Sequence, residues 1–152
     1  MKYGKLILEK NEFKLIKQYL KLNHTYQDYA HKNTLDTLEK LMSEAMIVDE
    51  EHVPSDVARL YSSITVTCNS QWQEMFILVA PSEENIRRNK TSVMSTLGAS
   101  IIGLSQGDVI KYGLPGSSMS LKIEKVEPRK NRNNRSLSKE VLDSTMSEVD
   151  KK

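Results

Sequence analysis

The side chains able to bind metals or act as nucleophiles are few and scattered in this 152-residue chain. Its histidines are His24, His31 and His52, and Cys68 is its single cysteine. No histidine pair has the i, i+4 spacing with which a helix commonly holds zinc. The sequence also has no phosphate-binding glycine loop and no serine nucleophile elbow. We therefore predict no self-contained active site, no metal and no cofactor, and we do not expect an enzyme.

Carboxylates are the remaining candidates for chemistry, because paired carboxylates hold hard cations such as Mg²⁺. The acidic run at 49–51 is interpreted as a solvated segment at a boundary rather than as a ligand set. Asp28 is the only acid in the polar stretch 23–32, which also contains Tyr26 and Tyr29. A lone acid in such a stretch is usually just a soluble turn residue, so Asp28 is a weak metal candidate.

Composition narrows the classes of protein that this chain can belong to. With 38% hydrophobic and 28% charged residues, it has the make-up of a globular protein rather than a disordered one. A net charge of only +2 argues against a protein whose main work is to coat nucleic acid. One cysteine excludes a disulfide scaffold, and no apolar run is long enough to span a membrane. We expect a cytoplasmic monomer without membrane contact.

The elements that must position these residues begin with a helical hairpin in residues 1–53. A short extended lead-in, Lys5–Glu9, precedes a predicted helix over about Glu12–Leu22, with Asn11 as its cap. After a turn at 23–32, Asn33 or Thr34 is predicted to cap a second helix over about Thr34–Met46. Each helix would be about 20 Å long.

The hydrophobic period changes to two after the break at Val53-Pro54, which indicates strands. A short helix capped by Ser95 and ended by Gly103 interrupts them. The sequence thus predicts an α+β fold in which residues 54–128 form a domain with an antiparallel sheet of four strands and one helix. The predicted elements are Ile64–Cys68, Phe76–Ala80, the helix Thr96–Ile102, Val109–Tyr112 and Met119–Val126, with 81–91 as a loop and a turn at Pro115-Gly116.

The tail, 129–152, begins with a basic run and continues with mixed charge and few apolar residues. Such a composition favours poor order. Its cations are candidates for nucleic-acid contact, although a solvated tail is the simpler interpretation. They are Arg129, Lys130, Arg132 and Arg135.

The order of signals in Ser92–Pro115 is the most specific pattern in the chain. A short apolar helix is followed by Gly103, the turn Gly107-Asp108, a strand and Leu114-Pro115-Gly116. This order resembles the C-terminal domain of the GreA/GreB transcript-cleavage factors and of Rnk, the regulator of nucleoside diphosphate kinase. The short hairpin and the absence of an acid pair at its tip make the chain more similar to Rnk.

The resemblance implies a fold, a partner and a set of site residues. It implies an FKBP-like C-terminal domain that docks at the rim of the secondary channel of bacterial RNA polymerase. In Gre factors, acids at the tip of a long coiled coil help to hold Mg²⁺ at the polymerase active site, so any Mg²⁺ would belong to the polymerase. For this chain we expect regulation of transcription elongation without efficient transcript cleavage. The implied docking residues are Ser92, Met94, Ser95 and Thr96, and the implied tip residues are Tyr26, Asp28 and Tyr29.

Two alternatives remain open. An FKBP-like fold also occurs in peptidyl-prolyl isomerases, which need an aromatic pocket. The aromatics available to the predicted domain are Tyr61, Trp72, Phe76 and Tyr112. The other alternative is a DNA- or RNA-binding protein that acts through the basic run 129–135.

Overall fold

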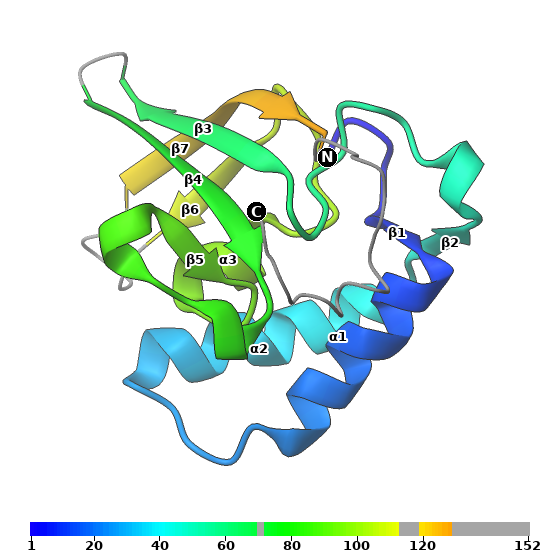
Figure 1. Cartoon of the computed structure of the whole chain (residues 1–152), viewed down its shortest axis with the longest axis horizontal. Coiled ribbons are helices and arrows are strands. Elements are labelled where there is room, and N and C mark those ends of the chain that lie inside the picture. Colours follow the sequence, from blue (N-terminus) through cyan, green and yellow to red (C-terminus); the bar gives the residue numbers. More distant parts are fainter. Residues whose placement is uncertain (70–71, 113–118, 129–152) are drawn as a thin grey trace, which may run out of the picture.

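The computed structural model describes residues 1–69, 72–112 and 119–128. A twisted sheet forms one layer, and a helical hairpin together with a short third helix forms the other (Figure 1). Within the described residues, no helix is long and apolar enough to cross a bilayer. The α+β class predicted from the sequence is confirmed, whereas its FKBP-like character stays a prediction.

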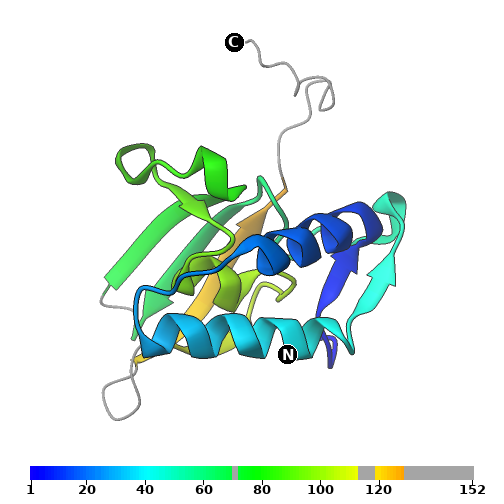
Figure 2. The ribbon, with the colours of Figure 1, turned by 90° about the horizontal axis from the view of Figure 1, so that it is seen from below.

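The hairpin consists of α1 (Lys10–Leu22) and α2 (Tyr29–Met42). Its ends are joined by a small parallel pair of strands, β1 (Ile7–Glu9) and β2 (Met46–Val48). In Figure 2 the two helices lie side by side across one face of the larger sheet. The short extended segment expected before the first helix is therefore confirmed as β1, and its pairing with β2 was not predicted.

Both helices begin earlier than predicted, because acids rather than asparagines cap them. Glu9 Oε1 accepts a hydrogen bond from Glu12 N at 3.0 Å, so Asn11 is not the cap of α1. Asp28 Oδ1 accepts one from His31 N at 2.8 Å, so neither Asn33 nor Thr34 caps α2. The segment expected as a long turn therefore shrinks to residues 23–28.

The end predicted for the second helix is also wrong. α2 stops at Met42, and Met46 lies in β2, where its N–H donates to Leu6 O at 2.8 Å. Apolar residues at three- and four-residue spacing continue toward Met46 and favour a longer helix. This segment instead pairs with β1, a strand far away in sequence.

Within the described part of the chain, the larger sheet has five strands in the order β5-β4-β3-β7-β6. The pairs β3/β4, β3/β7 and β6/β7 are antiparallel, while β5 lies parallel to β4 at the edge. The prediction of four strands was wrong because β5 has only three residues and no apolar alternation. The strands are β3 (Ser63–Cys68), β4 (Trp72–Val79), β5 (Lys90–Ser92), β6 (Val109–Tyr112) and β7 (Met119–Glu127).

The short helix α3 (Thr96–Ile101) forms as predicted. Ser95 Oγ accepts from Gly98 N at 3.0 Å, which confirms the predicted cap. Gly103 follows the helix with φ of +83°, a conformation that favours glycine. The turn predicted at Pro115-Gly116 lies outside the described residues.

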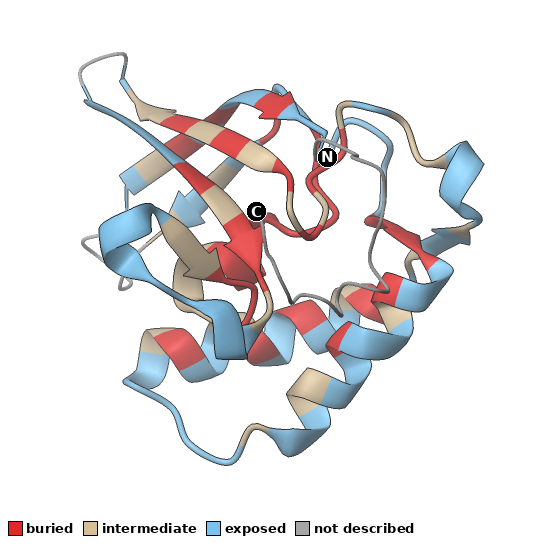
Figure 3. Ribbon diagram, in the orientation of Figure 1, coloured by how far each residue is buried: buried red, intermediate tan, exposed pale blue. Residues whose placement is uncertain are grey.

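One hydrophobic core joins the hairpin to the sheet. Buried side chains from α1, α2, α3 and the sheet form a single cluster. Figure 3 shows in red the buried residues of the helices and of the sheet. From the hairpin come Ile16, Leu35, Leu38 and Met42, and from the rest of the chain come Ile64, Val66, Phe76, Leu78, Val93, Ile101, Ile102 and Ile123.

Candidate functional site

The segment that the resemblance assigns to docking is a rigid corner between β5 and α3. Ser95 N–H and Ser95 Oγ–H both donate to Ser92 O, at 3.0 and 2.7 Å. Met94 N–H donates to Ser92 Oγ at 2.9 Å. These local hydrogen bonds hold the chain in one conformation, which is the geometry that a preformed contact surface requires.

The corner presents only part of itself to solvent. Ser92 and Met94 are buried, whereas Ser95 and Thr96 are half-buried. The structure therefore brings the four predicted docking residues together, but divides them into an inner pair and an outer pair. The outer pair is the part of the corner that a partner can reach.

The tip of the hairpin closes over this corner through His31. The buried imidazole accepts from Gln27 N at Nδ1, at 3.0 Å, and its Nε2 lies 2.7 Å from Met94 O. Because Nδ1 accepts, Nε2 must carry the hydrogen and donate to Met94 O. One side chain thus ties α2 to the docking corner.

His31 was not among the residues predicted for the site, although the sequence contains the signal for it. His31, Leu35, Leu38 and Met42 recur at four- and three-residue spacing and are all buried on one face of α2. Because the start of the helix was predicted too late, His31 was assigned to a turn. Its place in this series of buried residues was therefore not recognised.

Asp28 caps α2, and its charge also acts on Tyr112 in β6. Burial of Tyr112, together with the negative charges of Glu74 and Asp28, raises the pKa of the Tyr112 phenol. The tip carboxylate therefore lies within electrostatic reach of Tyr112 in β6.

The other two tip residues are tyrosines on the solvent side. Tyr29 is exposed, and the Tyr26 ring meets the edge of the His31 ring with centroids 5.9 Å apart. Lys32 Nζ lies 5.7 Å from the centroid of the Tyr26 ring and pairs with Asp36 at 2.8 Å. The three predicted tip residues are therefore neighbours, with Tyr26 supporting His31.

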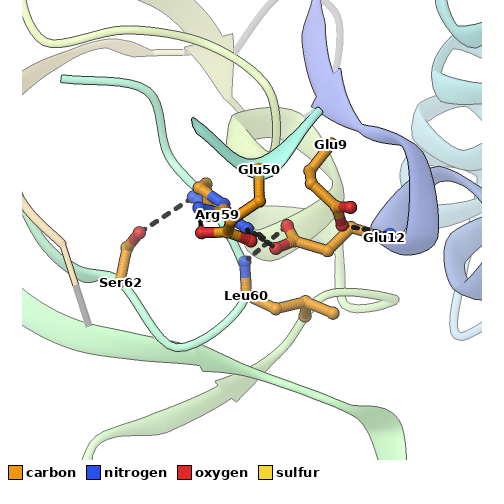
Figure 4. Close-up of polar contacts among 6 residues, drawn as sticks. All are labelled: Glu9, Glu12, Glu50, Arg59, Leu60 and Ser62. Atoms are coloured by element: carbon orange, nitrogen blue, oxygen red, sulfur yellow. Dashed lines mark hydrogen bonds and ion pairs between the residues drawn. The ribbon is translucent and has the colours of Figure 1, made fainter. Parts of the chain in front are cut away.

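A partly buried ion-pair cluster fixes the opposite end of the hairpin. The Arg59 guanidinium donates to Glu12 Oε2 through Nε at 3.0 Å and to both Glu50 oxygens at 2.8 Å (Figure 4). Glu12 Oε1 also accepts from Leu60 N at 3.3 Å. Burial disfavours the charged guanidinium, but the hydrogen bonds and charges of Glu50 and Glu12 outweigh it and raise the pKa of Arg59.

The acidic run after the hairpin forms an exposed trio of ligand-type atoms. Asp49, Glu51 and His52 each place one such atom within 4.8 Å of the others. Lys10 Nζ already lies 3.4 Å from Asp49, and all three side chains are solvated. Asp49 and Glu51 thus agree with the interpretation of the run as a solvated segment, whereas Glu50 between them pairs with Arg59.

The described aromatics do not converge on one pocket. Phe76 is buried in the core, and Trp72 pairs with Cys68 at the opposite end of β3 from Tyr61. At about 3.3 Å per residue, the two ends of β3 are roughly 17 Å apart. This spread does not support the isomerase alternative. The candidate nucleic-acid residues Arg129, Lys130, Arg132 and Arg135 lie outside the described residues.

Comparison with known proteins connects this geometry to a family. A family model described as "Transcription elongation factor, GreA/GreB, C-term" matches residues 53–128. Transcription elongation factor GreA of Clostridium botulinum is 33% identical over 90 residues, which are 59% of this chain and 56% of the relative. GreA of Thermoanaerobacter pseudethanolicus is 30% identical over 88 residues, covering 57% and 56%. The chain thus matches little more than half the length of these relatives.

A solved structure extends the likeness to the hairpin. The prokaryotic transcription elongation factor GreA/GreB from Nitrosomonas europaea superposes with a TM-score of 0.67 and 23% identity, covering 82% of this chain and 98% of that one. This likeness establishes a shared fold. Because the family model spans residues 53–128, half of the sequence, the chain belongs to the GreA/GreB family of transcription elongation factors.

Proposed function

We propose that this protein is a cytoplasmic regulator of transcription elongation that binds bacterial RNA polymerase at its secondary channel, in the manner of Rnk, without efficiently stimulating transcript cleavage. Family membership supports the elongation role and the polymerase as partner. The protein would have no active site of its own and would act on the polymerase by occupying the channel entrance as a monomer.

The length and placement of the hairpin carry the non-cleaving part of the proposal. Helices of 13 and 14 residues extend only about 20 Å. The tip is held against the docking corner by the hydrogen bond between His31 and Met94. A hairpin of this length and position is poorly suited to deliver a ligand for Mg²⁺ deep inside a pore.

The chemistry of the tip supports the same conclusion. Asp28 is the single tip acid, and one of its oxygens already accepts from His31 N. A second metal ion is usually held by more than one protein oxygen, since Mg²⁺ requires near-octahedral coordination. The tip supplies one carboxylate where an acid pair would be needed.

Titration into backtracked elongation complexes with Mg²⁺, recording complex formation and RNA shortening together, tests the proposal. Binding without shortening is the expected result. Binding with rapid shortening would disprove the non-cleaving part, and Asp28→Asn would then show whether the tip acid is responsible. Absence of binding at micromolar protein would disprove the proposal as a whole.

A further inference from the structure

The loop between β4 and β5 ends in a compact basic turn, Asn85–Lys90, that has no role in the site described above. All residues from Pro81 to Asn89 are exposed. Ile86 is 71% exposed, more than any other large apolar side chain among the described residues. Arg87, Arg88 and Lys90 surround it with positive charge. In Figure 2 the green loop that contains this turn projects beyond the edge of the sheet.

Backbone hydrogen bonds make the basic turn rigid. Asn85 N donates to Lys90 O and Lys90 N donates to Asn85 O, both at 2.9 Å. Asn89 adopts φ of +57°, and its carbonyl accepts from Ile77 N in β4 at 2.8 Å. A surface fixed in this way loses little conformational entropy when a partner binds, which favours recognition.

The acids of the same loop are directed away from the outer end of the turn. Glu83 accepts a hydrogen bond from the Tyr61 hydroxyl, and Glu84 Oε2 accepts from Ser92 N at 3.3 Å. None of the ion pairs among the described residues includes Arg87 or Arg88. Among the described residues, the turn therefore presents two guanidinium groups that form no ion pair, next to a solvent-exposed isoleucine.

This combination favours an acidic protein surface over a nucleic acid. Nucleic-acid surfaces use aromatic side chains for stacking and a broad basic excess, whereas this turn offers an aliphatic side chain on a chain with net charge +2. Arginine flanking a solvent-exposed apolar residue is a composition typical of protein interfaces. The turn also leads through β5 directly into the docking corner, so one partner can contact both.

We propose that the basic turn is a second contact with the polymerase, in which Ile86 enters an apolar spot and Arg87 and Arg88 meet surrounding carboxylates. This inference rests on the proposed function, because it takes RNA polymerase as the partner. In this arrangement the basic turn, rather than the neighbouring half-buried corner at Ser95 and Thr96, supplies most of the electrostatic attraction to the polymerase.

The test compares two pairs of matched variants in the full-length chain. Arg87→Glu with Arg88→Glu is set against Lys111→Glu with Lys122→Glu, which makes the same charge change on β6 and β7 at the opposite edge of the sheet. Ile86→Ser is set against Val109→Ser, since Val109 is exposed on β6. Circular dichroism confirms folding, and fluorescence anisotropy measures the dissociation constant for core polymerase at low and physiological salt.

We expect the arginine reversal to weaken polymerase binding about tenfold or more and to reduce its salt dependence. Ile86→Ser should weaken binding about threefold to tenfold with unchanged salt dependence. Both variants at the opposite edge should bind within about twofold of the unaltered protein.

Three results would overturn the inference. Unchanged polymerase binding by both turn variants, with normal binding by the unaltered protein, would refute the second contact and leave the proposed function intact. Loss of binding to a labelled single-stranded RNA or duplex DNA, with polymerase binding retained, would identify the turn as a nucleic-acid contact instead. Failure of the unaltered protein to bind polymerase would refute both proposals together.

Discussion

At the scale of single residues, Asp28 has a structural role that complicates any test of its function. Its carboxylate caps α2, and its charge also influences Tyr112. Replacement by alanine removes the cap and the charge together, so an altered activity would have two explanations. Asparagine keeps a capping oxygen and removes only the charge.

We predict that Asp28→Ala lowers the free energy of unfolding by about 1 kcal/mol, while Asp28→Asn lowers it by only a few tenths of a kcal/mol. Urea denaturation followed by circular dichroism measures both. Equal losses in the two variants would mean that the carboxylate stabilises the tip by its charge rather than by the hydrogen bond to His31 N.

Arg59 provides the second prediction at this scale. Its planar fork reaches Glu12 and Glu50 at once, which the single ammonium group of lysine cannot do. Arg59→Lys should cost about 2 kcal/mol, because the buried Glu12 carboxylate loses part of its pairing. Lys125→Ala is the control, since it removes only the exposed pair with Glu127 and should cost less than about 1 kcal/mol. A smaller loss for Arg59→Lys than for this control would contradict the assignment of Arg59 as the anchor of the hairpin.

At the scale of elements, α3 can lie against β5 only because residue 98 has no side chain. A Cβ on Gly98 would stand 2.1 Å from Ser92 O and 3.0 Å from Val93 Cα, both backbone atoms that cannot move independently. The close approach of helix and strand is what closes the docking corner.

Gly98→Ala should therefore destabilise the protein by about 3 kcal/mol, despite the better helix propensity of alanine. It should also weaken polymerase binding, because α3 must shift away from the corner. Alanine at Ser100, a half-buried residue of the same helix, is the matched control. A melting temperature of Gly98→Ala equal to that of the Ser100 variant would show that the corner is more plastic than its hydrogen bonds suggest.

The elements also show where sequence reasoning succeeds and where it stops. β3, β6, β7 and α3 were predicted closely, because alternation and a serine cap are local signals. β2 and β5 were missed, because each is a three-residue strand whose pairing partner is distant in sequence. The same limit applies to the candidate site: the sequence located a segment before α3, but the hydrogen bond from His31 to Met94 joins positions 63 residues apart and has no local signal.

At the scale of the whole molecule, the hairpin and the sheet share one core. Leu35 and Leu38 of α2 belong to the same buried cluster as Ile101 of α3 and Phe76 of β4. Neither part buries its apolar surface alone, so we expect one cooperative unfolding transition.

Leu38→Ala should cost about 3 kcal/mol and should lower the denaturation midpoint reported by Trp72 fluorescence as much as the midpoint reported by helical circular dichroism. A fragment limited to residues 54–128 should lack a cooperative transition and bind a hydrophobic dye. Separate transitions for the hairpin and the sheet, or a well-folded fragment, would contradict a shared core.

The parallel pairing of β1 with β2 has a consequence for how such a protein can change its reach over evolution. Because the chain enters and leaves the hairpin through one fixed pair of strands, insertions near the base would disturb the register of that pair. Equal insertions on both sides of the loop at residues 23–28 would leave the base untouched and lengthen the rod, by about 10 Å for every seven residues added to each helix. Because such insertions lie N-terminal to His31, they would leave the His31–Met94 hydrogen bond in place and carry only the new loop outward. One scaffold can thus keep its anchored base and corner while growth at a single loop sets how far the rod extends.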